Sequence, residues 1–77
     1  MGNTVNGCTA QWFSTAFSMN CINVSAAGRY QDRAACQAQL DKTGPIASLA
    51  KGTTKNGVSS GECTFKVTGN TATYLGQ

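Results

Sequence analysis

Histidine is absent from this 77-residue sequence, and only three side chains carry a carboxylate: Asp32, Asp41 and Glu62. Because histidine is the general base that enzymes use most often, the common acid–base and nucleophilic mechanisms lack their usual partner. Asp32 and Asp41 are nine residues apart in one expected helix, too far along it for the carboxylate pair of a glycosidase. Glu62 could join one of them, but solvated surface carboxylates are the simpler interpretation. The sequence therefore predicts a protein that is not an enzyme and that uses no cofactor.

Long apolar runs, phosphate-binding loops and dense charge are also missing. No stretch approaches the ~20 apolar residues of a transmembrane helix, and the glycines of residues 57–61 precede an expected strand rather than a helix. The net charge of +3 is far below that of a typical nucleic-acid binder. The first residues have neither the charged start nor the apolar run of a signal peptide, which is typical of a mature chain with an added initiator Met. We expect a monomer without a transmembrane segment and without a nucleic-acid partner.

The four cysteines are Cys8, Cys21, Cys36 and Cys63, and no two of them form a Cys-x-x-Cys pair. Zinc sites normally use close ligand pairs, so two disulfides are a better interpretation than a metal site. A chain this short buries only ~60% of its unfolded surface and is usually marginal without such cross-links. We favour pairing Cys8 with Cys63 and Cys21 with Cys36, although sequence alone leaves the other two connectivities open.

Disulfides persist in oxidising compartments, which favours a secreted, extracellular protein. Asn23 begins an Asn-Val-Ser sequon and is a candidate glycosylation site, which fits secretion but also occurs by chance.

Alternating apolar and polar side chains predict short strands at residues 8–13 and 17–21. In residues 63–75, Cys63, Phe65 and Val67 alternate with polar neighbours. Gly69 and Asn70 then separate two β-prone runs, which is a two-residue hairpin signal. We expect this hairpin to offer one apolar face that another element must cover.

Residues 25–42 are the one good helix candidate, with Tyr30, Ala34 and Ala38 at helical spacing and a stop signal at Gly44 and Pro45. Residues 45–60 have the least ordered composition, with a polar loop or hairpin at 51–60, and residues 45–51 could form a second helix. The simplest arrangement is a single α+β domain over residues 1–77. It is a two-layer sandwich in which an antiparallel sheet of about four strands packs against one main helix, with two disulfides.

Two features suggest a binding surface. Trp12 with Phe13 could form an aromatic platform for a sugar or another ligand, although a single tryptophan packed in a small core is the simpler interpretation. The basic side chains could form a patch for an acidic partner, although a solvated face is again simpler. The candidate surface consists of Trp12, Arg29, Arg33, Lys51 and Lys55.

The motifs at residues 34–40 (AACQAQL) and 61–67 (GECTFKV) resemble the killer-toxin-like small secreted effectors of fungi, which are related to the toxin subunits of a smut-fungus virus. In that group a cysteine-bearing helix precedes a glycine-cysteine-aromatic strand in a ferredoxin-like fold. The resemblance implies a secreted, non-enzymatic virulence or antimicrobial protein. Its partner would be a surface component or a protein of a host plant or a competing microbe. The alternative is a small extracellular binding module, either a carbohydrate-binding lectin or a protease inhibitor that presents the 51–60 loop.

Overall fold

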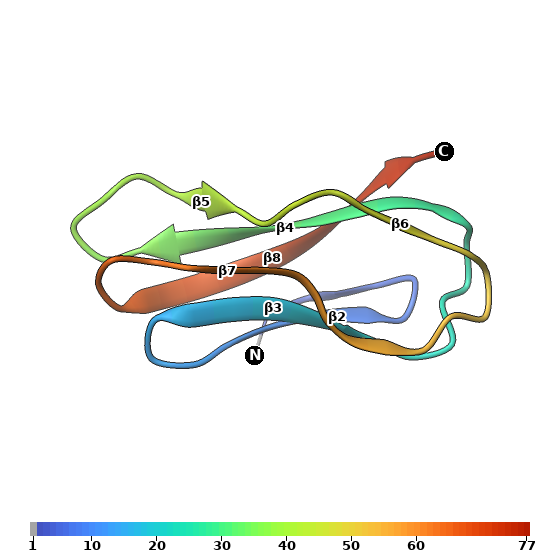
Figure 1. The fold of residues 1–77 in the computed structure, drawn as a ribbon, viewed down its shortest axis with the longest axis horizontal. Helices are drawn as coiled ribbons and strands as arrows, with labels where there is room; N and C mark the ends of the chain where they lie inside the picture. The colour runs from blue at the N-terminus through green and yellow to red at the C-terminus, as the bar shows by residue number, and fades with distance from the viewer. Residues whose placement is uncertain (1) are drawn as a thin grey trace.

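A computed structural model describes residues 2–77, and these residues form β-strands and no helix. Figure 1 shows the strands running along the long axis of an elongated molecule of 36 × 18 × 15 Å. In chain order they are β1 (Thr4–Val5), β2 (Cys8–Trp12), β3 (Ala16–Cys21), β4 (Gly28–Cys36), β5 (Lys42–Thr43), β6 (Ala47–Leu49), β7 (Lys55–Glu62) and β8 (Val67–Gly76).

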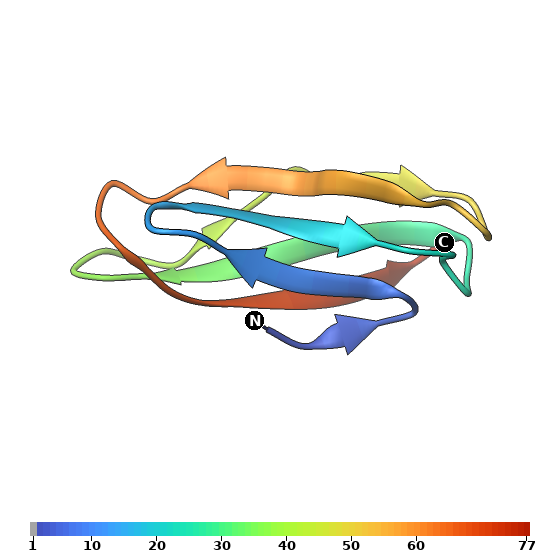
Figure 2. The same cartoon turned by 90° about the horizontal axis from the view of Figure 1, so that it is seen from below.

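The strands form two antiparallel sheets that pack against each other. The first sheet has the order β1-β2-β3-β7. In the second sheet β4 is central, with β8 on one edge and with β5 and β6 on the other. Figure 2, turned by 90°, shows β8 beneath the hairpin of β2 and β3. The architecture is therefore an all-β sandwich of two sheets.

The helix expected over residues 25–42 is wrong, and with it the α+β class and the ferredoxin-like fold. Residues 28–36 form β4, whose inward side chains Tyr30, Asp32, Ala34 and Cys36 are all buried. This is a strand period of two. A charged residue at the second inward position hides that period, and the alanines on both faces give the segment a helical composition. Ala34 faces the opposite sheet and is fully buried, whereas Ala35 lies on the outward side of β4.

The hairpin expected around Gly69 and Asn70 is also wrong. Residues 67–76 form one continuous strand, β8, paired with β4 along most of its length. The register shifts between Ala35 and Cys36, opposite Gly69 and Val67, so β8 bulges where a turn was expected. Phe65 lies outside the strand and is exposed, instead of contributing to a buried hairpin face.

The two N-terminal strands are confirmed as β2 and β3, which form a hairpin with Trp12 opposite Phe17. Asn6 and Gly7 form the turn that joins β1 to β2, and both residues have the positive φ that a type I′ hairpin turn requires (48° and 91°). Residues 45–51 do not form the second helix that was one possibility for them, because residues 47–49 form β6. The polar loop expected over 51–60 is largely the strand β7.

All four cysteines are paired, as expected, but the favoured connectivity is wrong. Cys8 bonds Cys21, its direct neighbour across the β2–β3 hairpin. Cys36, at the end of β4, bonds Cys63, which follows β7, so this disulfide joins the two sheets. The preference for Cys21 with Cys36 depended on a helix that is not there.

The core between the sheets consists of two apolar clusters. One contains Phe17, Ala34, Val67 and the Cys36–Cys63 disulfide. The other lies towards the opposite end of the strands and is larger, with the members Cys8, Ala10, Met19, Cys21, Val24, Tyr30, Leu49, Val58 and Ala72.

A buried polar layer separates the two clusters along β4 and β8. The Asp32 carboxylate accepts hydrogen bonds from Ser59 Oγ (2.8 Å) and from Asn70 Nδ2 (3.0 Å). Asn70 Nδ2 also donates to the carbonyl oxygens of Gln11 (3.0 Å) and Ser18 (3.1 Å). These bonds join β4 and β8 to β2, β3 and β7, so the layer connects both sheets through polar contacts.

Candidate ligand-binding groove

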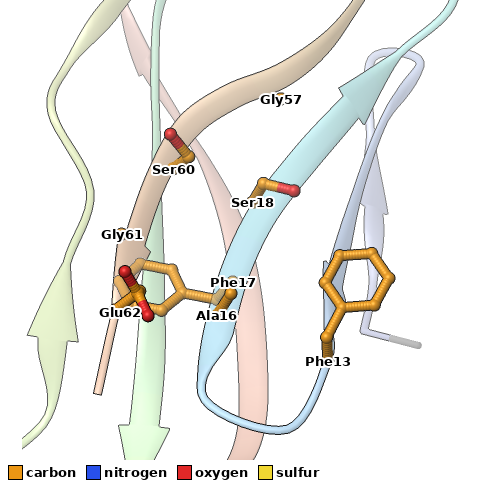
Figure 3. A pocket seen from close by; sticks show the side chains of 8 residues that line it. All are labelled: Phe13, Ala16, Phe17, Ser18, Gly57, Ser60, Gly61 and Glu62. Carbon is orange, nitrogen blue, oxygen red and sulfur yellow. The ribbon is translucent and has the colours of Figure 1, made fainter. Parts of the chain in front are cut away.

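An open groove of about 370 Å³ lies over β3 and β7. Ser18 lies between the inward residues Phe17 and Met19, so its side chain is on the face of the sheet that points away from the core. Figure 3 shows the groove with its side chains as sticks. Its lining residues are Phe13, Ala16, Phe17, Ser18, Gly57, Ser60, Gly61 and Glu62.

The groove exists because β3 and β7 pair irregularly and because two of its lining residues lack side chains. The register shifts on both sides of Met19, and Ser59 on β7 has a positive φ of 55°. At Gly61, an added Cβ would lie 2.5 Å from the ring of Phe17. The backbone of β7 therefore lies directly on the Phe17 ring, and only glycine fits there.

Phe13 supplies an aromatic wall. It follows β2, is 63% exposed, and its backbone N–H donates to the carbonyl of Ala16 (2.8 Å). Trp12 is partly buried against the apolar cluster that contains Phe17. Strand alternation thus turns Trp12 inward and Phe13 outward. This agrees with the simpler interpretation, in which the single tryptophan packs in the core. The aromatic side chain that lines the groove is therefore Phe13, not Trp12.

Hydroxyl and carboxylate groups complete the lining. Ser18 Oγ accepts a hydrogen bond from Gln11 Nε2 (3.2 Å), which leaves its own proton free to donate. Ser60 and Glu62 are exposed, and Glu62 forms no ion pair with any of residues 2–77. An aromatic face beside hydroxyls and a carboxylate can bind a ring that is apolar on its faces and polar at its edge.

The basic residues predicted as a binding surface are spread over the molecule. Arg29 and Arg33 lie on the outward side of β4, where Arg33 Nε is 3.4 Å from Asp41 Oδ2. Lys55 pairs with Cys21 at one end of β3, whereas Trp12 pairs with Phe17 at the other end of that strand. Lys51 lies in the turn between β6 and β7. The structure does not bring these side chains together with Trp12, and a role for them in binding stays a prediction.

Asn23 lies in the loop between β3 and β4, is exposed, and donates its backbone N–H to Thr54 Oγ1 (3.0 Å). The position is accessible, and its glycosylation stays a prediction. Within residues 2–77 no group of three or more His, Cys, Asp or Glu side chains is placed to hold a metal ion. In the same residues no helix is long and apolar enough to span a membrane.

Asp32 is not the surface carboxylate that the sequence suggested, because it is completely buried in the polar layer. Desolvation raises the pKa of its carboxyl, and the hydrogen bonds from Asn70 and Ser59 oppose that rise. Neighbouring Ser60 lines the groove while Ser59 bonds Asp32. The polar layer therefore lies directly behind the groove and fixes the backbone of β7 there.

Sequence reasoning did not find the groove. It depends on a bulge in β7 and on contact between Gly61 and Phe17, which are far apart in the chain. The available local signal was the strand alternation that places either Trp12 or Phe13 outward. Comparison of the chain with protein-family models, curated proteins and solved structures found no match.

Proposed function

We propose that this protein is a secreted, non-enzymatic carbohydrate-binding module that holds one saccharide unit in the groove over β3 and β7. The observation that carries the proposal is the exposed Phe13 ring beside a groove lined by hydroxyls and by Glu62. The proposal adopts the binding-module alternative and moves its aromatic platform from Trp12 to Phe13.

The chemistry of a sugar matches the lining. The C–H groups on one face of a pyranose pack on an aromatic ring, and the hydroxyls at its edge donate to carboxylates and exchange hydrogen bonds with serines. Glu62 favours neutral or amino sugars and disfavours acidic ones, because a second carboxylate close by costs Coulomb energy. A rigid sheet supports the site, so little ordering is needed on binding.

Secretion is supported by the two disulfides, which are stable in an oxidising compartment. The role implied by the resemblance to fungal killer-toxin-like effectors, action on a host plant or a competing microbe, stays a prediction. A sugar-binding module could serve such a role by attaching the protein to a cell surface.

A glycan array with neutral, amino and acidic saccharides tests the proposal. We expect binding to neutral or amino sugars that Phe13→Ala reduces roughly tenfold or more, because the stacking face is lost. Glu62→Gln should weaken amino-sugar binding most strongly.

The matched control is Phe65→Ala, since Phe65 is similarly exposed but does not line the groove. It should bind the array like the parent protein. No binding to any saccharide, or an equal loss from Phe13→Ala and Phe65→Ala, would contradict the proposal.

A further inference from the structure

Three loops lie together at one end of the sandwich, and each carries a large exposed apolar side chain. They are residues 13–15, 37–41 and 63–66, and we call this region the loop end. Figures 1 and 2 both show the three loops at the left. Leu40 is 89% exposed, Phe65 is 54% exposed, and Phe13 belongs to the groove described above.

The loop end holds Leu40 and Phe65 on a fixed support. Gln39 Oε1 accepts hydrogen bonds from the backbone N–H groups of Thr64 (2.8 Å) and Phe65 (3.2 Å). The backbone N–H of Gln37 donates to the carbonyl of Lys66 (2.8 Å). The Cys36–Cys63 disulfide joins the bases of the same two loops. The two loops that carry Leu40 and Phe65 are therefore held together, and little conformational entropy is lost when their side chains are covered.

Basic side chains accompany the two apolar ones. Lys66 follows Phe65 directly, and Lys42 lies two positions after Leu40. Both lysines are exposed, and neither forms an ion pair with any of residues 2–77. Of the two carboxylates at this end, Asp41 is paired with Arg33, and Glu62 lies in the groove. The region thus combines apolar tips with unpaired positive charge, in a chain of net charge +3.

We infer that the loop end docks on the surface of a membrane that contains anionic lipid, with Leu40 and Phe65 inserted among the acyl chains and with Lys42 and Lys66 at the headgroups. Separate protruding side chains would need a matching pocket on a protein partner, whereas a fluid bilayer accommodates them without one. Segments that lie on a membrane surface place Phe and Leu at the boundary between headgroups and acyl chains and lysines at the anionic headgroups. This inference is independent of the saccharide groove.

The test is sedimentation of the intact, disulfide-bonded protein with vesicles of phosphatidylcholine alone or mixed with phosphatidylserine. We expect stronger binding to the mixed vesicles and weaker binding as salt rises. The double variant Leu40→Ser with Phe65→Ser should lower the partition coefficient roughly tenfold or more on both vesicle types, because buried apolar area is lost. Lys42→Gln with Lys66→Gln should remove the preference for anionic lipid.

The matched control is Ile22→Ser. Ile22 is 60% exposed but follows β3 at the opposite end of the sandwich. It should bind vesicles like the parent protein, and all variants should keep the parent's denaturation midpoint. Absence of vesicle binding at any lipid composition would overturn the inference, as would an equal loss from Ile22→Ser. Saccharide binding can be intact in either case, so the two proposals fail separately.

Discussion

Asp32 shows how one buried residue can make the stability of a small sandwich depend on pH. Burial raises the pKa of its carboxyl above the ordinary value of 3.8. The folded protein therefore holds the proton more tightly than the unfolded chain does. The contribution of Asp32 to the free energy of unfolding is full below the unfolded pKa and is lost as pH rises through the raised, folded pKa.

We predict that Asp32→Asn removes this loss of stability. The new amide is neutral at every pH in this range, and its carbonyl oxygen can still accept the hydrogen bond from Ser59. The measurement is urea denaturation of parent and variant from about pH 3 to about pH 8. The control is Asp41→Asn, which changes the exposed partner of Arg33. Its free energy of unfolding should fall with rising pH as that of the parent does. If the free energy of unfolding of Asp32→Asn falls with rising pH as much as that of the parent, a group other than Asp32 causes the fall.

Gly61 allows a second residue-scale prediction, because its missing Cβ makes room for the Phe17 ring. Gly61→Ala should destabilise the fold by about 1–3 kcal/mol, since the ring or the β7 backbone must move. Gly69→Ala is the control, because no atom lies within 4 Å of its added Cβ and its φ is not positive. Its effect should be below about 0.5 kcal/mol. Equal midpoints for the two variants in chemical denaturation would contradict the close packing of Gly61 on Phe17.

The same residues show which local features sequence could reveal. Strand alternation places Trp12 and Phe13 on opposite sides, because Trp12 is the last residue of β2 and Phe13 follows it directly. Alternation did not reveal that Asp32 is buried, since a carboxylate in a sequence is normally assigned to the surface unless its hydrogen-bond partners are known. Those partners, Ser59 and Asn70, come from strands 27 and 38 positions away. No local pattern could have shown them.

Among the elements, the short hairpins were predictable and the long strands were not. The β2–β3 hairpin depends on neighbours in sequence, and its alternation is clear. The strands β4 and β8 pair with each other across more than thirty residues, and each has a polar residue in an inward position, Asp32 and Asn70. The local composition of β4 favours a helix, and Gly69 and Asn70 in β8 favour a turn. Pairing between the two strands, which are distant in sequence, outweighs both local preferences.

Substitutions at adjacent alanines of β4 test whether this element is a strand. Ala34 is buried among Phe17 and Val67, so Ala34→Leu should overpack that cluster and cost about 1–3 kcal/mol. Ala35 lies on the outward side, so Ala35→Leu should change stability by less than about 0.5 kcal/mol. Chemical denaturation with the disulfides intact measures both. A large loss from Ala35→Leu with none from Ala34→Leu would mean that the wrong face of β4 has been placed inward.

At the scale of the whole molecule, the groove and the loop end both follow from the way the two sheets are joined. The polar layer fixes β7 behind the groove, and the Cys36–Cys63 disulfide joins the loops that carry Leu40 and Phe65. In the chain-entropy model this bond closes a loop of about 28 residues and contributes about 3.5 kcal/mol, against about 3 kcal/mol for Cys8–Cys21. Composition predicted two disulfides and a small domain, but the positions of the bonds required the topology.

Mapping the disulfides tests this topology most directly. Trypsin cleavage without reduction, after every lysine and arginine, gives peptides 1–29, 34–42 and 56–66, which together contain all four cysteines. With the pairing seen here, mass spectrometry should find peptide 34–42 linked to 56–66, and peptide 1–29 alone with an internal disulfide. Either other connectivity links all three peptides into one species. That single linked species would contradict the two-sheet arrangement, and with it the groove and the loop end.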